Sequence, residues 1–316
     1  MSKAIFFSTG GVYTPSMLGM LSALLKKYNI NMDEISAVGG ISSGAMIASF
    51  LATSNDATTM IDNVLNILKQ NSNGKAISAH YSWLNNLISL FTQESIFDDK
   101  GIDQVLFENL KDKKLEKDLY LGYTNETDME YVRRKFIKNT VDSDLHKYVH
   151  ASMSIPVIFK GIDDKGKRLS DGGLFHTLPT EQLRDYVYDC MEKKIYEAEV
   201  HLISASPYKF HPPKIVSDGF ARPIRETIRL TKSLHNITMH NDKLWLDLFV
   251  ENCLLRGFNL IIHEHMFPAK LMEIIDKKIP FEKYNTIHED EIVRLYNIGE
   301  EVINDKNELL HKNLNF

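Results

Sequence analysis

A serine set between small residues is the first feature that could do chemistry. Gly40-Ile41-Ser42-Ser43-Gly44 fits the pattern G-x-S-x-G and follows a short apolar run. Such a serine occupies a sharp turn between a strand and a helix, because glycines two positions away let the backbone pass closely. The start of the following helix favours negative charge beside the serine. We predict that Ser42 is a nucleophile and that Gly40 and Gly44 support its turn.

A glycine pair near the N-terminus could bind a developing negative charge. Thr9-Gly10-Gly11-Val12 also follows an apolar run, and consecutive glycines can present backbone N–H groups to an oxyanion. The same residues would also suit an ordinary tight turn before a helix, and the dinucleotide pattern G-x-G-x-x-G is absent. We assign Gly10, Gly11 and Val12 as candidate oxyanion donors.

An aspartate followed by two glycines could supply the base that a serine nucleophile needs. Asp171-Gly172-Gly173 stands directly after Lys167-Arg168-Leu169-Ser170, and the glycines allow another backbone to approach closely. By itself the pattern also fits a β-turn. We predict that Asp171 is the base for Ser42, with Gly172 and Gly173 supporting it.

Histidine or metal chemistry is the main alternative. A Ser-His-Asp triad would need one of the downstream histidines, and none has a motif around it: His176, His201, His235 and His263. The run from His263 to His265 and the pair His146 and His150 lack the remaining ligands of a metal site, so we expect no metal and no cofactor. Cys190 and Cys253 lie outside any C-x-x-C pair and are expected to be reduced thiols.

The elements that must position these residues begin with an alternating pattern. Residues 3–9 and 35–39 read as short buried strands, and helical periodicity follows each of them, first after a predicted N-cap at Thr14. Strand–helix–strand–helix favours a parallel sheet with crossover helices. Further strands are predicted over 119–124 and 200–204, a hairpin over 157–169, and helices over 56–70, over 83–91 and through most of the chain from 222.

Four blocks in this order resemble the patatin-like phospholipase family: the glycine pair, G-x-S-x-G, Ala151-Ser152-Met153-Ser154-Ile155-Pro156, and Asp171-Gly172-Gly173. The resemblance implies a three-layer α/β/α fold with a mostly parallel central sheet and a helical C-terminal part. We expect residues 1–190 to form the catalytic core, with residues 191–316 packed on it. The resemblance also implies hydrolysis of phospholipid or glycerolipid acyl esters by a Ser42–Asp171 dyad through an acyl-enzyme. A carboxylate with a pKa of about 4 is a weak base for this step.

The oxyanion segment departs from the family pattern G-G-G-x-[RK]-G. Thr9, Tyr13 and Thr14 replace the first glycine, the basic residue and the last glycine. Two alternatives therefore stay open: a catalytically weak binding or regulatory protein on the same fold, and an acyltransferase. The predicted helix over 83–91 could be a lid or a membrane-facing helix, or part of the core.

Composition narrows the classes of partner. The chain has 316 residues, of which 43% are hydrophobic and 25% charged, and a formal net charge of −5. This charge offers no broad cationic field for nucleic acid. No run approaches the ~18 apolar residues of a spanning helix. We expect a soluble protein without a Sec signal, cytoplasmic by its cysteine usage, that meets an acyl-ester lipid by transient membrane-surface contact.

Overall fold

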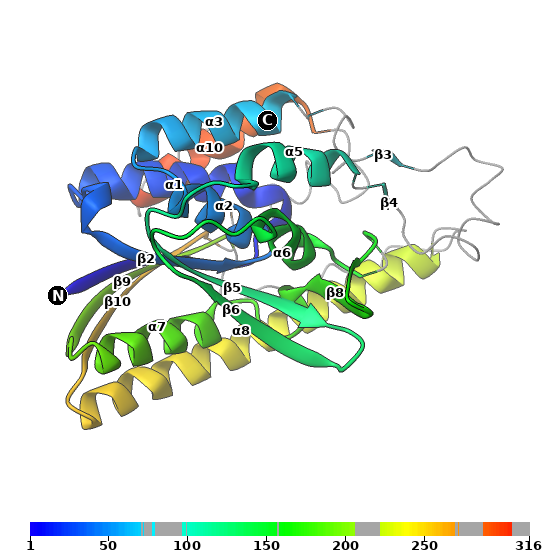
Figure 1. The fold of residues 1–316 in the computed structure, drawn as a ribbon. Coiled ribbons are helices and arrows are strands. Elements are labelled where there is room, and N and C mark those ends of the chain that lie inside the picture. The colour runs from blue at the N-terminus through cyan, green and yellow to red at the C-terminus, as the bar shows by residue number, and fades with distance from the viewer. Residues whose placement is uncertain are drawn as a thin grey trace.

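A single large sheet organises the molecule in the computed structural model (Figure 1). The structure describes residues 1–70, 72, 78–79, 97–98, 100–156, 158–205, 222–268, 271 and 287–304, so the predicted helix over 83–91 lies outside the described residues. The strand order is β10-β9-β1-β2-β5-β8-β7, and β6 pairs with β5 off this path. The strands of this sheet are β1 (Ser2–Phe7), β2 (Ile35–Ile41), β5 (Asp118–Asn125), β6 (Glu130–Phe136), β7 (Ile162–Asp164), β8 (Lys167–Asp171), β9 (Glu197–Ser204) and β10 (Asn259–Met266).

Helices cover both faces of this sheet and make three layers, which confirms the predicted fold class. One face carries α1 (Thr14–Lys27), α2 (Ser43–Ala52), α3 (Ala57–Gln70), α5 (Lys100–Leu110), α6 (Leu145–Met153) and α10 (Glu289–Asn304). The other face carries α7 (Thr180–Glu192) and α8 (Arg222–Leu255). Strand β1 shows why both faces need cover, because Ile5 and Phe7 join the first core while Ala4 and Phe6 join the second. The short elements are β3 (Ser78–Ala79) paired with β4 (Phe97–Asp98), and the 3₁₀ turns η1 (Gly11–Tyr13), η2 (Met32–Glu34) and η3 (Gly172–Leu174).

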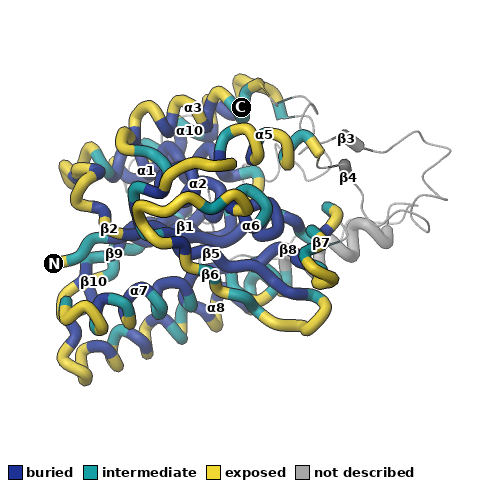
Figure 2. Tube along the Cα trace, viewed as in Figure 1, coloured by how far each residue is buried: buried dark blue, intermediate teal, exposed yellow. Residues whose placement is uncertain are grey.

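Most of the sheet is parallel, as predicted. Strands β10, β9, β1, β2 and β5 pair in parallel, while β6, β7 and β8 add antiparallel pairs beyond β5. Helix α2 is buried along its whole length (Figure 2), since it is apolar on all sides and lies inside the helical layer. Ser42 immediately precedes this helix, so the predicted nucleophile is held by two buried elements.

Strands β2 and β8 both pair with the same edge of β5, and this explains how distant parts of the chain meet. Strand β6 pairs with β5 along Leu119–Asn125 and therefore occupies one edge of β5. On the other edge, β2 pairs as far as Ile41 opposite Gly122, and β8 takes over with Asp171 opposite Tyr123. The chain leaves β2 at Ser42, just where β8 begins its pairing. Adjacent registers on one strand thus bring the two segments side by side.

Three local predictions differ from the structure. The chain from residue 222 is not helical throughout, because β10 follows α8 and extends the sheet beside β9. The hairpin is shorter than predicted, with β7 confined to Ile162–Asp164, although Gly166 does supply the positive φ, at 80°. Thr14 is the first residue of α1 rather than its N-cap, and its hydroxyl donates to the Gly11 carbonyl. Among the described residues, no helix has both the length and the apolar character to cross a bilayer.

Candidate active site

Ser42 adopts the strained backbone expected of a nucleophile on a sharp turn. Its φ is 58° and its ψ is −132°, a conformation that costs a non-glycine residue free energy and persists only where neighbours fix it. A Cβ on Gly40 would lie 2.4 Å from the carbonyl carbon of Gly44, and a Cβ on Gly44 would lie 2.3 Å from the carbonyl oxygen of Ser8. Both glycines are therefore required by close backbone contacts around the turn.

The structure brings the predicted nucleophile and base into direct contact. The Ser42 hydroxyl donates a hydrogen bond of 2.7 Å to Oδ2 of Asp171, across 129 positions of sequence. Both side chains are buried, with exposed fractions of 6% and 3%. The other carboxylate oxygen, Oδ1, accepts 2.6 Å from the N–H of Gly173, and the Asp171 N–H donates to the Ser154 carbonyl. The carboxylate is thus aimed at the hydroxyl by both its own backbone and the following glycine.

Burial changes the acid–base character of this carboxylate. Removal from water raises the pKa of Asp171 from 3.8 to about 7, and hydrogen bonds from Ser42 and Gly173 only partly offset the rise. A carboxylate with a pKa near neutrality accepts a proton far more readily than one near 4. This environment removes much of the weakness expected of an ordinary aspartate base.

Ser152 fixes the backbone of the turn at Ser42, a role that sequence reasoning did not assign. The N–H of Ser42 donates 2.8 Å to the Ser152 hydroxyl, which donates 2.6 Å to the carbonyl of Gly122. The hydroxyl therefore bridges the end of β5 to the turn and satisfies a buried N–H. Ser152 was visible in the sequence as the second residue of the Ala151–Pro156 block, but the atoms with which it forms hydrogen bonds could not be predicted from sequence.

The candidate oxyanion segment lies against the serine turn. Gly10 has φ −148° and ψ −28°, Gly11 has φ 50°, and a Cβ on Gly10 would lie 2.9 Å from the Ser43 hydroxyl oxygen. Within the described part of the chain, the N–H groups of Gly10, Gly11 and Val12 have no acceptor. Free N–H groups beside a serine are the requirement for oxyanion binding. Their role stays a prediction.

The residues that depart from the family pattern occupy distinct places. Tyr13, which stands where the family has a basic residue, is buried, and its ring lies 5.8 Å from that of Phe267. The hydroxyls of Thr9 and Ser43 are buried and have no hydrogen-bond partner among the described residues. The segment therefore keeps its backbone donors but replaces the cation with an aromatic core contact.

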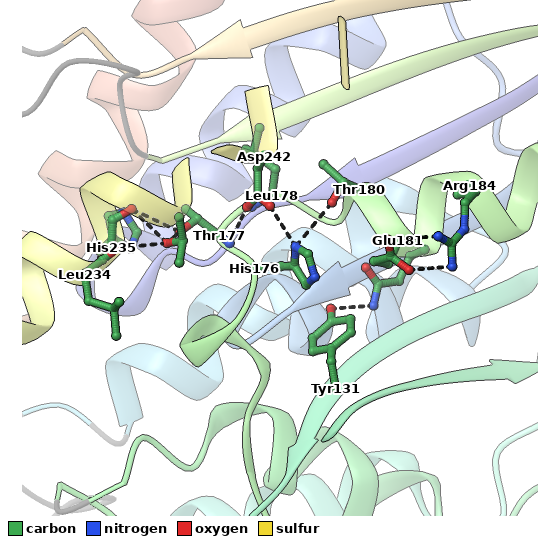
Figure 3. A network of polar contacts seen from close by, with 12 residues as sticks. Tyr131, His176, Thr177, Leu178, Thr180, Glu181, Arg184, Leu234, His235 and Asp242 are labelled. Atoms are coloured by element: carbon green, nitrogen blue, oxygen red, sulfur yellow. Dashed lines mark hydrogen bonds and ion pairs between the residues drawn. The ribbon is translucent and has the colours of Figure 1, made fainter. Parts of the chain in front are cut away.

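A polar network from α8 supports both glycine segments (Figure 3). Asp242 accepts hydrogen bonds from the N–H groups of Thr177 (2.6 Å) and Leu178 (2.9 Å), and its other oxygen lies 2.7 Å from Nδ1 of His176. The carbonyl of Thr177 in turn accepts 3.0 Å from the N–H of Thr9. One buried aspartate therefore fixes the segment that connects Asp171 to the glycine loop. No local motif marks Asp242, so sequence reasoning missed it.

The histidines of the alternative triad lie elsewhere. His176 contacts Asp242, while His201 and His263 face each other on β9 and β10. The carbonyl of His235 accepts a bond from the Thr177 hydroxyl. Within the described residues no histidine bonds to Ser42 or Asp171, so the geometry favours the dyad over a triad.

Comparison with known families agrees with this geometry. A family model described as patatin-like phospholipase matches residues 5–184, which is more than half of the 316 residues. The chain therefore belongs to the patatin-like phospholipase family. The match includes every predicted site residue, from Gly10 to Gly173.

Solved structures with a related arrangement are distant. VipD from Legionella pneumophila is 15% identical, with a TM-score of 0.42, over 96% of this chain and 66% of that one. The type III effector protein ExoU is 13% identical, with a TM-score of 0.27, over 78% of this chain and 53% of that one. The chain thus spans at most about two thirds of these proteins, and such distant likenesses carry no substrate or partner with them. No curated protein matches the chain.

Proposed function

We propose that the protein hydrolyses carboxylic ester bonds of phospholipids or other glycerolipids through Ser42 and Asp171. The observation that carries the proposal is the 2.7 Å hydrogen bond between the Ser42 hydroxyl and a buried carboxylate with a raised pKa. The family membership supports acyl esters of lipids as the substrate class. Contact with the substrate would be transient and at a membrane surface.

The chemistry proceeds in two halves. The Ser42 oxygen attacks the ester carbonyl carbon while its proton passes to Oδ2 of Asp171, and the N–H groups of Gly10, Gly11 and Val12 donate to the oxyanion. Collapse of this intermediate breaks the ester bond, returns the proton to the leaving alcohol and leaves an acyl group on Ser42. Water then attacks the acyl-enzyme, again losing its proton to Asp171, and releases the fatty acid with the serine restored. Neither half requires a metal or a cofactor.

Substitution of the two dyad residues tests the proposal. Ser42→Ala and Asp171→Asn should each lower kcat on phospholipid vesicles and short-chain esters by on the order of 10⁴-fold or more. Ser49→Ala is the matched control, because this buried serine of α2 only donates to the carbonyl of Ala45 within its own helix. A folded Ser42→Ala or Asp171→Asn protein with the wild-type rate would refute the dyad.

A binding or regulatory role is the competing proposal, favoured by the buried Tyr13 at the position of the family's basic residue. A fluorophosphonate probe separates the two, since only an activated serine reacts quickly. Rapid labelling that disappears in Ser42→Ala supports the hydrolase, while absence of labelling in the folded wild type supports the binding protein. Adding an acceptor alcohol distinguishes an acyltransferase by the appearance of a new ester.

A further inference from the structure

A cluster of histidines and a glutamate lies on the outer strands of the sheet, away from the dyad. The register of β9 and β10 places His201 directly opposite His263, and Glu199 two residues earlier on β9 points to the same face. Oε1 of Glu199 lies 3.2 Å from Nε2 of His263 and 3.5 Å from Nε2 of His201. One ligand atom from each of the three residues lies within 4.8 Å of the other two.

These separations suit a tetrahedral ion. Zinc binds nitrogen and oxygen ligands at about 2.0–2.1 Å, which puts the donor atoms of a tetrahedron roughly 3.3 Å apart. Two of the three separations, 3.2 and 3.5 Å, are close to this value. The two imidazole rings are stacked with their planes 20° apart, so binding requires them to rotate until both lone pairs point at one ion. Two histidines, a carboxylate and a water form a donor set that zinc and similar ions prefer over calcium or magnesium.

His201 supplies the observation that a simple ion pair does not explain. Its side chain is 1% exposed, and within the described residues its buried Nε2 makes no well-formed hydrogen bond, since its contact with Oε1 of Glu199 is 3.5 Å long. An orphaned buried nitrogen costs free energy, and a metal ion would satisfy it.

The surroundings of His201 orient it as a ligand. Its Nδ1 lies 3.1 Å from Nε2 of His265, so a proton on Nδ1 would bond to His265 and leave Nε2 free for a metal. The ring of Tyr28, at the end of α1, lies 5.3 Å from the His201 ring and covers this side. His263 is 36% exposed, which gives an ion access from solvent. The ammonium of Lys3, on the neighbouring strand β1, forms an ion pair with Glu34 at 2.6 Å.

We propose that Glu199, His201 and His263 form a zinc site, with water as the fourth ligand, that joins the edge strand β10 to β9. His201 pairs through β9 with the level of Ile5 on β1, whereas Ser42 follows β2 beyond the level of Phe7. At about 3.3 Å per residue, four residues put the ion roughly 13 Å from the dyad along the strands. The ion would therefore act apart from ester hydrolysis, and the proposal departs from the expectation from sequence that no metal is bound.

Zinc titration of the untagged full-length chain, stripped of metal with a chelator, tests the proposal. Calorimetry should give one zinc per chain, and zinc at 100 times its Kd should raise Tm by about 4 °C. His263→Ala and Glu199→Gln should each weaken binding by more than 100-fold. His265→Gln should weaken binding by about 10–100-fold, as loss of an outer partner does.

Two controls keep the result specific. His240→Ala removes an exposed histidine of α8 and should leave the zinc affinity unchanged. Ser42→Ala should also bind zinc normally, so failure of the hydrolase proposal and failure of the zinc proposal give different results. Cobalt in place of zinc should show the intense visible absorption of tetrahedral coordination. Absence of a 1:1 complex, or equal affinity in wild type and His263→Ala, would overturn the site.

Discussion

At the scale of residues, the proposed activity depends on the hydrogen-bonded pair of the Ser42 hydroxyl and the Asp171 carboxylate. Burying a carboxylate normally costs free energy, because its charged form loses the water that solvates it. In the proposed mechanism that cost has a chemical use, because a pKa of about 7 would let Asp171 take up a proton from the serine and return it to a leaving alcohol. The two hydrogen bonds that reach the carboxylate, from Ser42 and Gly173, lower its pKa and partly offset the effect of burial, so a fraction of Asp171 is ionised at neutral pH.

The activity should therefore depend on pH with a single limb near 7. Above this pKa Asp171 is ionised and can accept a proton, and below it the protonated carboxyl cannot act as a base. We expect kcat/KM on an ester that does not titrate to fall about tenfold per pH unit below 7 and to level off above it. Histidines titrate in the same range, so His176→Asn is the control and should keep the limb. A profile that is flat between pH 5 and 8 would exclude Asp171 as the base.

At the scale of elements, the site depends on where strands and helices end. The strand-to-helix turn at Ser42 and the glycines after Asp171 were readable from sequence, because local sterics demand small residues at fixed offsets. The partners Ser152 and Asp242 were not readable. Their hydrogen bonds join α6 to β2 and α8 to the segment after η3, and such pairings depend on packing rather than on spacing.

Helix α8 should act on the site through Asp242. Asp242→Ala leaves two buried N–H groups, those of Thr177 and Leu178, without an acceptor. We expect a loss of about 2–4 kcal/mol in the free energy of unfolding and a fall in kcat/KM of roughly tenfold, because Thr177 also holds Thr9. Denaturant unfolding and initial rates measure the two effects.

The matched control for this change is Asp247→Ala on the same helix. The Asp247 side chain is 57% exposed and, among the described residues, pairs only with Lys243, so its loss should cost under about 0.5 kcal/mol. Asp242→Asn keeps one acceptor oxygen, so its free energy of unfolding should lie between those of the Asp242→Ala and Asp247→Ala proteins. Equal stability of the Asp242→Ala and Asp247→Ala proteins would show that the network does not support the loop.

At the scale of the molecule, the catalytic half was easier to predict than the outer half. Alternating elements and four ordered motifs were enough for the layered fold and for the meeting of Ser42 with Asp171. Strand β10 was missed because its run, Asn259-Leu260-Ile261-Ile262-His263, is short and follows a helix of 34 residues. Without β10 there was no means to place His263 beside His201, since parallel neighbours are fixed only by the assembled sheet.

The last described helix, α10, packs on α1, and this contact should set the position of the glycine loop that precedes α1. A Cβ on Gly299 would lie 2.0 Å from the carbonyl oxygen of Ser16, and one on Gly19 would lie 2.0 Å from that of Tyr296. Alanine normally favours a helix over glycine by up to about 1 kcal/mol. Here we expect Gly299→Ala instead to destabilise the protein by about 1–3 kcal/mol, because backbone cannot yield as a flexible side chain can. Thermal unfolding measures this change against Glu301→Ala, an exposed position of the same helix, and the displaced loop should also slow fluorophosphonate labelling of Ser42. A Gly299→Ala protein at least as stable as wild type would mean that α10 does not hold α1 through this backbone contact.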